Sequence, residues 1–157
     1  MPLVELTRGY QFSSAHRLHS DRFSLADNAA IYGRCNNPNG HGHTYRLEVT
    51  IRGPVSRSTG AIVDAQRLDE VVHRQIIRRL DRKNLDTLIA PEDGPTSTTE
   101  ALAALVWRLL AAALPPGRLW RLRVEETPNN FFELDREGAD RTISPIPQGR
   151  GQKASAS

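Results

Sequence analysis

The feature that most constrains the fold of this chain is a strict alternation of side chains over residues 42–53. Apolar residues occupy every second position of this segment: Tyr45, Leu47, Val49 and Ile51. The residues between them are mostly polar or charged. Because successive side chains of a strand point to opposite faces of a sheet, this period of two predicts a strand with one buried face and one solvent-facing face.

Similar patterns predict the other elements. Residues 10–18, 119–126 and 131–134 are expected to be extended, and residues 61–63 to follow a turn or hairpin marked by Gly53, Pro54 and Gly60. Apolar residues recur at helical spacing over residues 65–80. A second helix is expected from the spacing of Leu102, Leu105, Val106, Leu109 and Ala113. Ser97 and Glu100 form a capping-box pattern at its start, and the Pro-Pro-Gly at 115–117 ends it.

The expected elements follow one another as a hairpin, two helices and a second hairpin. This order predicts an α+β domain with an antiparallel four-stranded sheet and both helices on one face. The other face of so small a sheet must be exposed to solvent or covered by other protein, and oligomerisation is one way to cover it. We expect one domain over residues 1–135 and a flexible C-terminal tail over 136–157, which is rich in Gly, Pro, Gln and Ser. Residues 21–39 are expected to form a long loop.

Composition excludes several classes of protein. The single cysteine rules out an internal disulfide and favours a reducing, cytoplasmic setting. We find no segment long and apolar enough to span a membrane, and no secretion signal at the N-terminus. The net charge of +3 is mild and spread out, without the aromatic-basic stripe of a nucleic-acid binder. A small anionic substrate is compatible with it.

Three histidines form the most informative constellation. His41 and His43 are two apart on a predicted strand, so their imidazoles project to the same face. His16 ends the first predicted strand and reaches the same place if the two strands pair. Three neutral imidazoles with an open fourth position are the usual arrangement of a catalytic zinc site. His19 and His73 are interpreted as a loop residue and an exposed helix residue.

Two further residues leave alternatives open. Cys35 could be a fourth ligand that closes a structural site, a thiolate beside the metal that acts as base or nucleophile, or an inert packed thiol. Glu126 follows an inward-facing run on its strand, where a carboxylate is costly unless it is paired. It could be a satisfied structural group, or it could bind a ligand with several N–H donors.

Together these residues resemble the 6-pyruvoyl-tetrahydropterin synthase family, and the likeness runs from about Tyr10 to Leu134. The segments that carry it are 12–18 (FSSAHRL), 35–45 (CNNPNGHGHTY), 80–86 (LDRKNLD), 97–100 (STTE) and 126–130 (ETPNN). The family also contains the 6-carboxytetrahydropterin synthases of queuosine biosynthesis. The sequence of residues 35–43 looks more like that of the family members that form the pyruvoyl product.

The resemblance implies a tunnelling fold (T-fold) whose sheets form a barrel on oligomerisation, commonly as a homohexamer of two trimers. It implies a zinc-dependent lyase that eliminates triphosphate from 7,8-dihydroneopterin triphosphate to give 6-pyruvoyl-tetrahydropterin. Zinc would be held by His16, His41 and His43. Cys35 would be the general base and Glu126 the anchor of the pterin, with Thr98 and Thr99 flanking the pterin ring.

One departure from the family's pattern concerns proton transfer. The family has Asp-His where this chain has Asp81-Arg82, and that histidine joins the cysteine and aspartate in a catalytic triad. Arginine stays protonated and cannot shuttle a proton near neutral pH. Asp81 is carried over as a catalytic residue, but the histidine's role is not. A paralogue with altered or lost chemistry is therefore an alternative to the active lyase. Ala101 is a smaller departure, at a position where Asn often follows the Glu.

Overall fold

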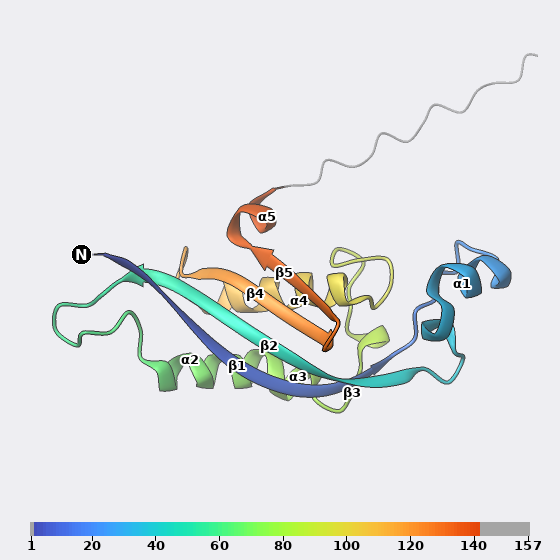
Figure 1. The fold of residues 1–157 in the computed structure, drawn as a ribbon, viewed down its shortest axis with the longest axis horizontal. Coiled ribbons are helices and arrows are strands. Elements are labelled where there is room, and N and C mark those ends of the chain that lie inside the picture. The colour runs from blue at the N-terminus through green and yellow to red at the C-terminus, as the bar shows by residue number, and fades with distance from the viewer. Residues whose placement is uncertain (1, 142–157) are drawn as a thin grey trace, which may run out of the picture.

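A five-stranded sheet with the order β3-β1-β2-β4-β5 is the frame of the molecule (Figure 1). In the computed structural model, which describes residues 2–141, β1 (Leu3–His16) and β2 (His41–Pro54) pair antiparallel over their full length. β4 (Leu119–Thr127) and β5 (Asn130–Asp135) extend the antiparallel sheet beyond β2. The short β3 (Lys83–Asn84) pairs parallel with the end of β1. The predicted α+β class is confirmed, but the predicted count of four strands missed β3.

Helices cover one face of this sheet, as predicted (Figure 1). Residues 65–80 form one helical stretch with a π-helical middle, made of α2 (Ala65–Val72), η2 (His73–Ile77) and α3 (Arg78–Leu80). α4 (Thr99–Ala113) packs beside it. The four apolar residues of the alternating segment in β2 are at most 2% exposed and meet the buried faces of these helices. The hydrophobic core therefore lies between the sheet and the helices.

The start of α4 corrects the predicted capping box. Thr98, not Ser97, is the N-cap, and its hydroxyl oxygen accepts a hydrogen bond from the backbone N–H of Ala101 at 3.3 Å. The Ser97 hydroxyl instead donates to Asp86. Both residues are good cap formers, and sequence spacing alone does not distinguish them.

A β-bulge changes which residue of β4 is buried. The register between β2 and β4 shifts between Thr50 and Ile51, so that Ile51 pairs with Leu119. Leu119 is consequently buried, and the ring of Trp120 lies 4.3 Å from the guanidinium carbon of Arg52. Strict alternation over residues 119–126 predicts that Trp120 shares the inward face with Leu122 and Val124. That prediction is wrong for Trp120, because an extra residue in a bulge reverses the faces beyond it.

Two segments also differ from prediction. The expected loop over residues 21–39 contains α1 (Leu25–Tyr32) and the 3₁₀ turn η1 (Gly33–Asn36), and Figure 1 shows α1 projecting from one end of the sheet. The turn predicted before residues 61–63 is present, and residues 61–63 themselves form bends. The predicted tail begins with a short helix, α5 (Arg136–Asp140), while residues 142–157 lie outside the described part of the chain. No helix within residues 2–141 is long and apolar enough to cross a membrane.

The alternation of β2 yields a direct test of which face is buried. Leu47→Ala should lower the free energy of unfolding by about 2–5 kcal/mol, because Leu47 is fully buried and a cavity would remain. Arg46→Ala is the matched control on the exposed face, with an expected change within about 0.5 kcal/mol. Urea unfolding followed by circular dichroism measures both. Equal losses for the two variants would contradict the described faces.

Candidate metal centre

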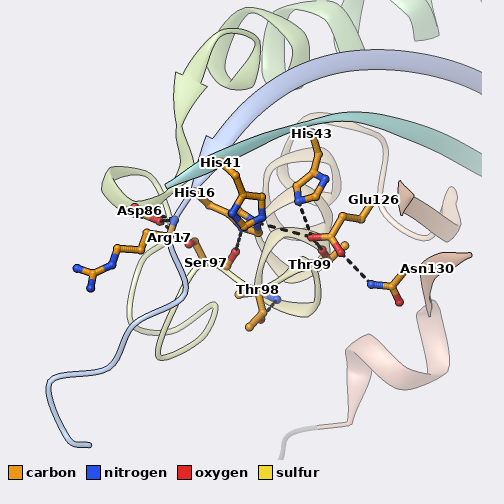
Figure 2. A network of polar contacts seen from close by, with 11 residues as sticks. His16, Arg17, His41, His43, Asp86, Ser97, Thr98, Thr99, Glu126 and Asn130 are labelled. Atoms are coloured by element: carbon orange, nitrogen blue, oxygen red, sulfur yellow. Dashed lines mark hydrogen bonds and ion pairs between the residues drawn. The ribbon is translucent and has the colours of Figure 1, made fainter. Parts of the chain in front are cut away.

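The three predicted histidines meet at one end of the β1–β2 pair (Figure 2). The antiparallel register places His16 opposite His41, and His43 follows two residues along on the same face. One ligand atom from each ring lies within 4.8 Å of the others. Gly40 permits this approach, because it has a φ of +68° and a Cβ there would lie 3.0 Å from the carbonyl oxygen of His16. The structure thus brings together all three imidazoles.

Hydrogen bonding sets the orientation of the most buried ring. His16 is 1% exposed, and its Nδ1 lies 2.7 Å from the carbonyl oxygen of Ser97. A carbonyl oxygen can only accept, so Nδ1 carries the proton and Nε2 of the neutral ring presents a lone pair. That Nε2 lies 3.2 Å from Nε2 of His41. Two nitrogen ligands at 2.0–2.1 Å from a tetrahedral ion would be about 3.3 Å apart.

An unpaired nitrogen atom also fits a metal. His43 Nε2 faces the cluster and is buried without a hydrogen-bond partner within residues 2–141. Buried polar atoms are rarely left unpaired in native structures. Three imidazoles with one tautomer fixed by a carbonyl are a donor set suited to a divalent transition metal. The residues present therefore fit a metal ion, and three protein ligands leave coordination positions open for a substrate.

Glu126 faces the histidine cluster from β4 (Figure 2). Its Oε1 lies 3.7 Å from His16 Nε2 and 3.5 Å from His43 Nε2. The hydroxyl of Thr99 donates to Oε1 at 3.0 Å, and the amide of Asn130 donates to Oε2 at 2.8 Å. Glu126 continues the inward-facing alternation of Leu122 and Val124, and a second register shift, where β4 meets β5, lies at this residue. Each carboxylate oxygen accepts one bond and keeps a lone pair for another.

The two predicted threonines hold different positions. Thr99 is 3% exposed and contacts Glu126 directly. Thr98 is half-buried, and its hydroxyl oxygen accepts from the α4 backbone while its own proton stays available for donation. Both lie at the N-terminal end of α4, on the side of Glu126 and the histidines (Figure 2).

Cys35 lies in η1, half-buried, in the segment that leads into β2. Its carbonyl oxygen accepts the backbone N–H of Leu18 at 2.8 Å, which ties this segment to the chain just after β1. Burial raises the pKa of the Cys35 thiol, and the negative charge of Glu126 raises it further. Among the described residues the compact group of ligand atoms comprises the three histidines without Cys35. The structure therefore does not favour the interpretation of Cys35 as a fourth ligand.

Asp81 and Arg82 lie at the edge of β1 and not in this cluster. Asp81 Oδ1 accepts the backbone N–H of Ser13 at 2.9 Å, and Arg82 N–H donates to Ser13 O at 2.6 Å. The Arg82 side chain is 90% exposed and its φ is +57°, which is uncommon for a residue other than glycine. The polar contacts found within residues 2–141 link Asp81 to Ser13 and Arg82 and not to Cys35.

Sequence reasoning missed three residues that support the site. Ser97 orients His16, Asn130 holds Glu126, and Asp86 accepts from both Ser97 and the backbone N–H of Arg17. The capping-box pattern predicts a different role for Ser97, and Asp86 stands in the sequence only as the last residue of the motif at 80–86. The sequence signal that could have found them is that both lie inside motifs shared with the resembling family.

Fold and site together define an α+β domain whose three converging histidines fit a metal ion. A family model described as 6-pyruvoyl tetrahydropterin synthase matches residues 5–137, and the chain belongs to this family. The 6-pyruvoyl tetrahydrobiopterin synthase of Drosophila melanogaster is 42% identical over 132 residues, which cover 83% of this chain and 79% of that protein. The human protein of the same name is 39% identical, covering 82% and 88%. These relatives confirm the predicted family.

The solved structure of Caenorhabditis elegans 6-pyruvoyl tetrahydropterin synthase is similar, with a TM-score of 0.80 and 36% identity. It matches 86% of this chain and 96% of that chain. The likeness confirms the T-fold that the sequence resemblance implied.

Metal binding should depend on pH in a way set by the buried rings. Burial lowers the pKa of both His41 and His43 below the ordinary value of 6.5, and the nearby His16 lowers that of His41 further. A ligating imidazole must be neutral, so protons compete with the metal only below these lowered pKa values. We expect cobalt affinity to stay constant from pH 8 to about pH 6.5 and to fall at lower pH. Chelator competition in non-coordinating buffers measures it, and a decline that begins above about pH 7 would contradict the shift.

Proposed function

We propose that this chain is a zinc-dependent 6-pyruvoyl-tetrahydropterin synthase, a carbon–oxygen lyase that eliminates triphosphate from 7,8-dihydroneopterin triphosphate. One observation carries the proposal: three imidazoles converge with an open coordination position, and a carboxylate with spare lone pairs faces them. The family model over residues 5–137 and the printed names of the relatives support it. His16, His41 and His43 are the proposed zinc ligands. A bound zinc ion would polarise substrate oxygen atoms as a Lewis acid.

Glu126 is the proposed anchor of the pterin. An amino-pyrimidine edge presents adjacent N–H donors, and a carboxylate whose two oxygens each keep one lone pair can accept two of them side by side. Thr99 and Asn130 fix the carboxylate, so its side chain loses little conformational entropy when a ligand binds. Thr98 lies beside this position with a free hydroxyl proton. The pterin ring is thereby placed next to the histidine cluster.

Cys35 is the proposed general base. In the metal-free site, burial and Glu126 disfavour its thiolate. Positive charge at the three-histidine cluster and N–H donors bound to Glu126 both oppose that effect, so the thiolate forms when metal and substrate are present. The base is therefore activated only in the loaded site.

Asp81 is the proposed partner of Cys35 in proton transfer, and we propose that a neighbouring copy supplies it. Within one chain Asp81 lies at the edge of β1, without a described contact to Cys35. The sheet face opposite the helices carries polar and charged residues and is open in a single chain. A homohexamer made of two trimers would cover this face and bring a second chain's edge to the pocket. Analytical ultracentrifugation of the purified protein tests the hexamer.

The first test of the activity is product analysis. Zinc-loaded protein is incubated with 7,8-dihydroneopterin triphosphate, and the products are identified by mass. We expect the pyruvoyl product and free triphosphate. The carboxy product would establish the 6-carboxytetrahydropterin alternative instead, and unchanged substrate with zinc still bound would refute a lyase.

Substitution of the thiol separates the roles of Cys35. Cys35→Ala should lower turnover by about 10²–10⁴-fold, the usual contribution of a general base, while the zinc content stays at that of the unaltered protein. Steady-state rates and metal analysis are measured on the same sample. Cys35→Ser is the matched control for packing, and it should resemble Cys35→Ala in rate. Loss of zinc together with the thiol would instead show a closed four-ligand site.

A second candidate is that this chain is a paralogue with altered chemistry, and Arg82 is the observation that favours it. Its guanidinium is exposed and permanently charged, and it stands where the family has a histidine that transfers protons. If that candidate holds, Arg82→His raises pyruvoyl-forming turnover by about 10²-fold or more. Arg79→His, on the exposed side of α3, is the control and leaves the rate unchanged. An unchanged rate for Arg82→His would remove any special role for Arg82.

A further inference from the structure

The carboxylate of Asp86 joins two segments that both hold His16 (Figure 2). Its Oδ1 accepts the Ser97 hydroxyl at 2.5 Å, and its two oxygens lie 3.0 and 3.1 Å from the backbone nitrogen of Arg17. Arg17 directly follows His16 in the chain. Ser97 provides the carbonyl oxygen that accepts the His16 Nδ1 proton. One carboxylate thus fixes both the backbone that carries the imidazole and the residue that orients its ring.

Asp86 is itself held firmly. It lies in the 3₁₀ turn η3 (Leu85–Thr87), directly after β3, and β3 pairs with the last part of β1. The side chain of Asn84 accepts the Asp86 backbone N–H at 2.9 Å, and Leu85 is fully buried in the core. The exposed carboxylate therefore reaches the buried Ser97 from a fixed point on the edge of the sheet.

A second contact shows that Asp86 is not needed to hold the whole segment before α4. Arg108 of α4 forms a two-pronged ion pair with Asp93, with N–O distances of 3.0 and 2.7 Å. This pair fixes the middle of the segment independently. What Asp86 adds is local, because it fixes the end at which Ser97 presents its carbonyl oxygen to His16.

We propose that Asp86 is a positioning residue for the metal centre, acting on His16 through Ser97 and through the backbone of Arg17. This inference rests on the proposed metal site. Without the carboxylate, the Ser97 carbonyl moves more freely, and it holds less firmly the His16 ring whose proton it keeps on Nδ1 and whose lone pair it keeps on Nε2. Outer partners of this kind typically contribute about 10–100-fold to metal affinity.

The test compares four variants of the full chain with the unaltered protein: Asp86→Ala, Ser97→Ala, the double variant, and Asp64→Ala. Asp64 is the matched control, because its carboxylate likewise accepts hydrogen bonds from two other residues, the backbone N–H groups of Gln66 and Arg67, but at the start of α2. Zinc affinity is measured by chelator competition, the ligand field by the visible spectrum of the cobalt form, and stability by melting of the metal-free protein.

We expect Asp86→Ala to weaken zinc binding by about 10–100-fold and to change the cobalt spectrum. Asp64→Ala should lower the melting temperature while leaving zinc affinity and spectrum unchanged. The double variant should bind zinc no more weakly than Asp86→Ala, because the serine acts on the same ring through the same carboxylate.

Unaltered zinc affinity and cobalt spectrum in Asp86→Ala would overturn the proposal and leave Asp86 as a support of the fold alone. If Asp86→Ala does not fold, Ser97→Ala carries the test: it keeps the backbone carbonyl, so weaker zinc binding supports the proposal and unaltered binding overturns it. Failure of the unaltered protein to bind zinc or cobalt would overturn the metal site itself. Metal binding without turnover would overturn only the proposed activity, because none of these readouts requires a substrate.

Discussion

The pairing of β1 with β2 is the constraint on which the site depends. The two strands run antiparallel over fourteen residues each, and their shared end places His16 directly opposite His41. A slip of one residue would turn every side chain of one strand to the other face and would separate the imidazoles. The buried alternation of β2 against the helices therefore fixes the register, and the register fixes the metal centre. The core and the site are held by the same strand pairing.

The parts that could be predicted are those encoded by periodicity. The alternation of β2 and the helical spacing of α4 revealed the fold class and the face on which His41 and His43 lie. Strand ends and bulges could not be predicted in this way. The bulge near Trp120 reverses the face on which a side chain lies, and no residue type in the sequence marks its position. The two-residue β3 was missed for a related reason: so short a segment has no period.

The residues of the site also fall into those that could be predicted from the sequence and those that could not. The histidines could be predicted to converge, because two of them share a strand and the third ends its neighbour. Asp86 and Ser97 could not, because their contacts join segments eleven residues apart whose approach is set by packing and not by local pattern. Motif resemblance drew attention to the segments that contain them, without giving a reason for either residue. The structure supplies that reason for Ser97 in the bond to His16.

The electrostatic design of the pocket connects its parts. Burial lowers the pKa values of His41 and His43, and the negative charge of Glu126 offsets part of that effect. Burial raises the pKa of the Cys35 thiol, and Glu126 raises it further. In this state the neutral forms of His41, His43 and Cys35 are favoured together, which prepares the imidazoles for a cation but keeps the thiol protonated. Positive charge at the cluster reverses the balance for the thiol alone. Under the proposed function, the same burial that makes the imidazoles ready for a metal delays formation of the Cys35 base until the site is loaded, and the proposed role of Asp86 is to keep His16 in the correct tautomer for that event.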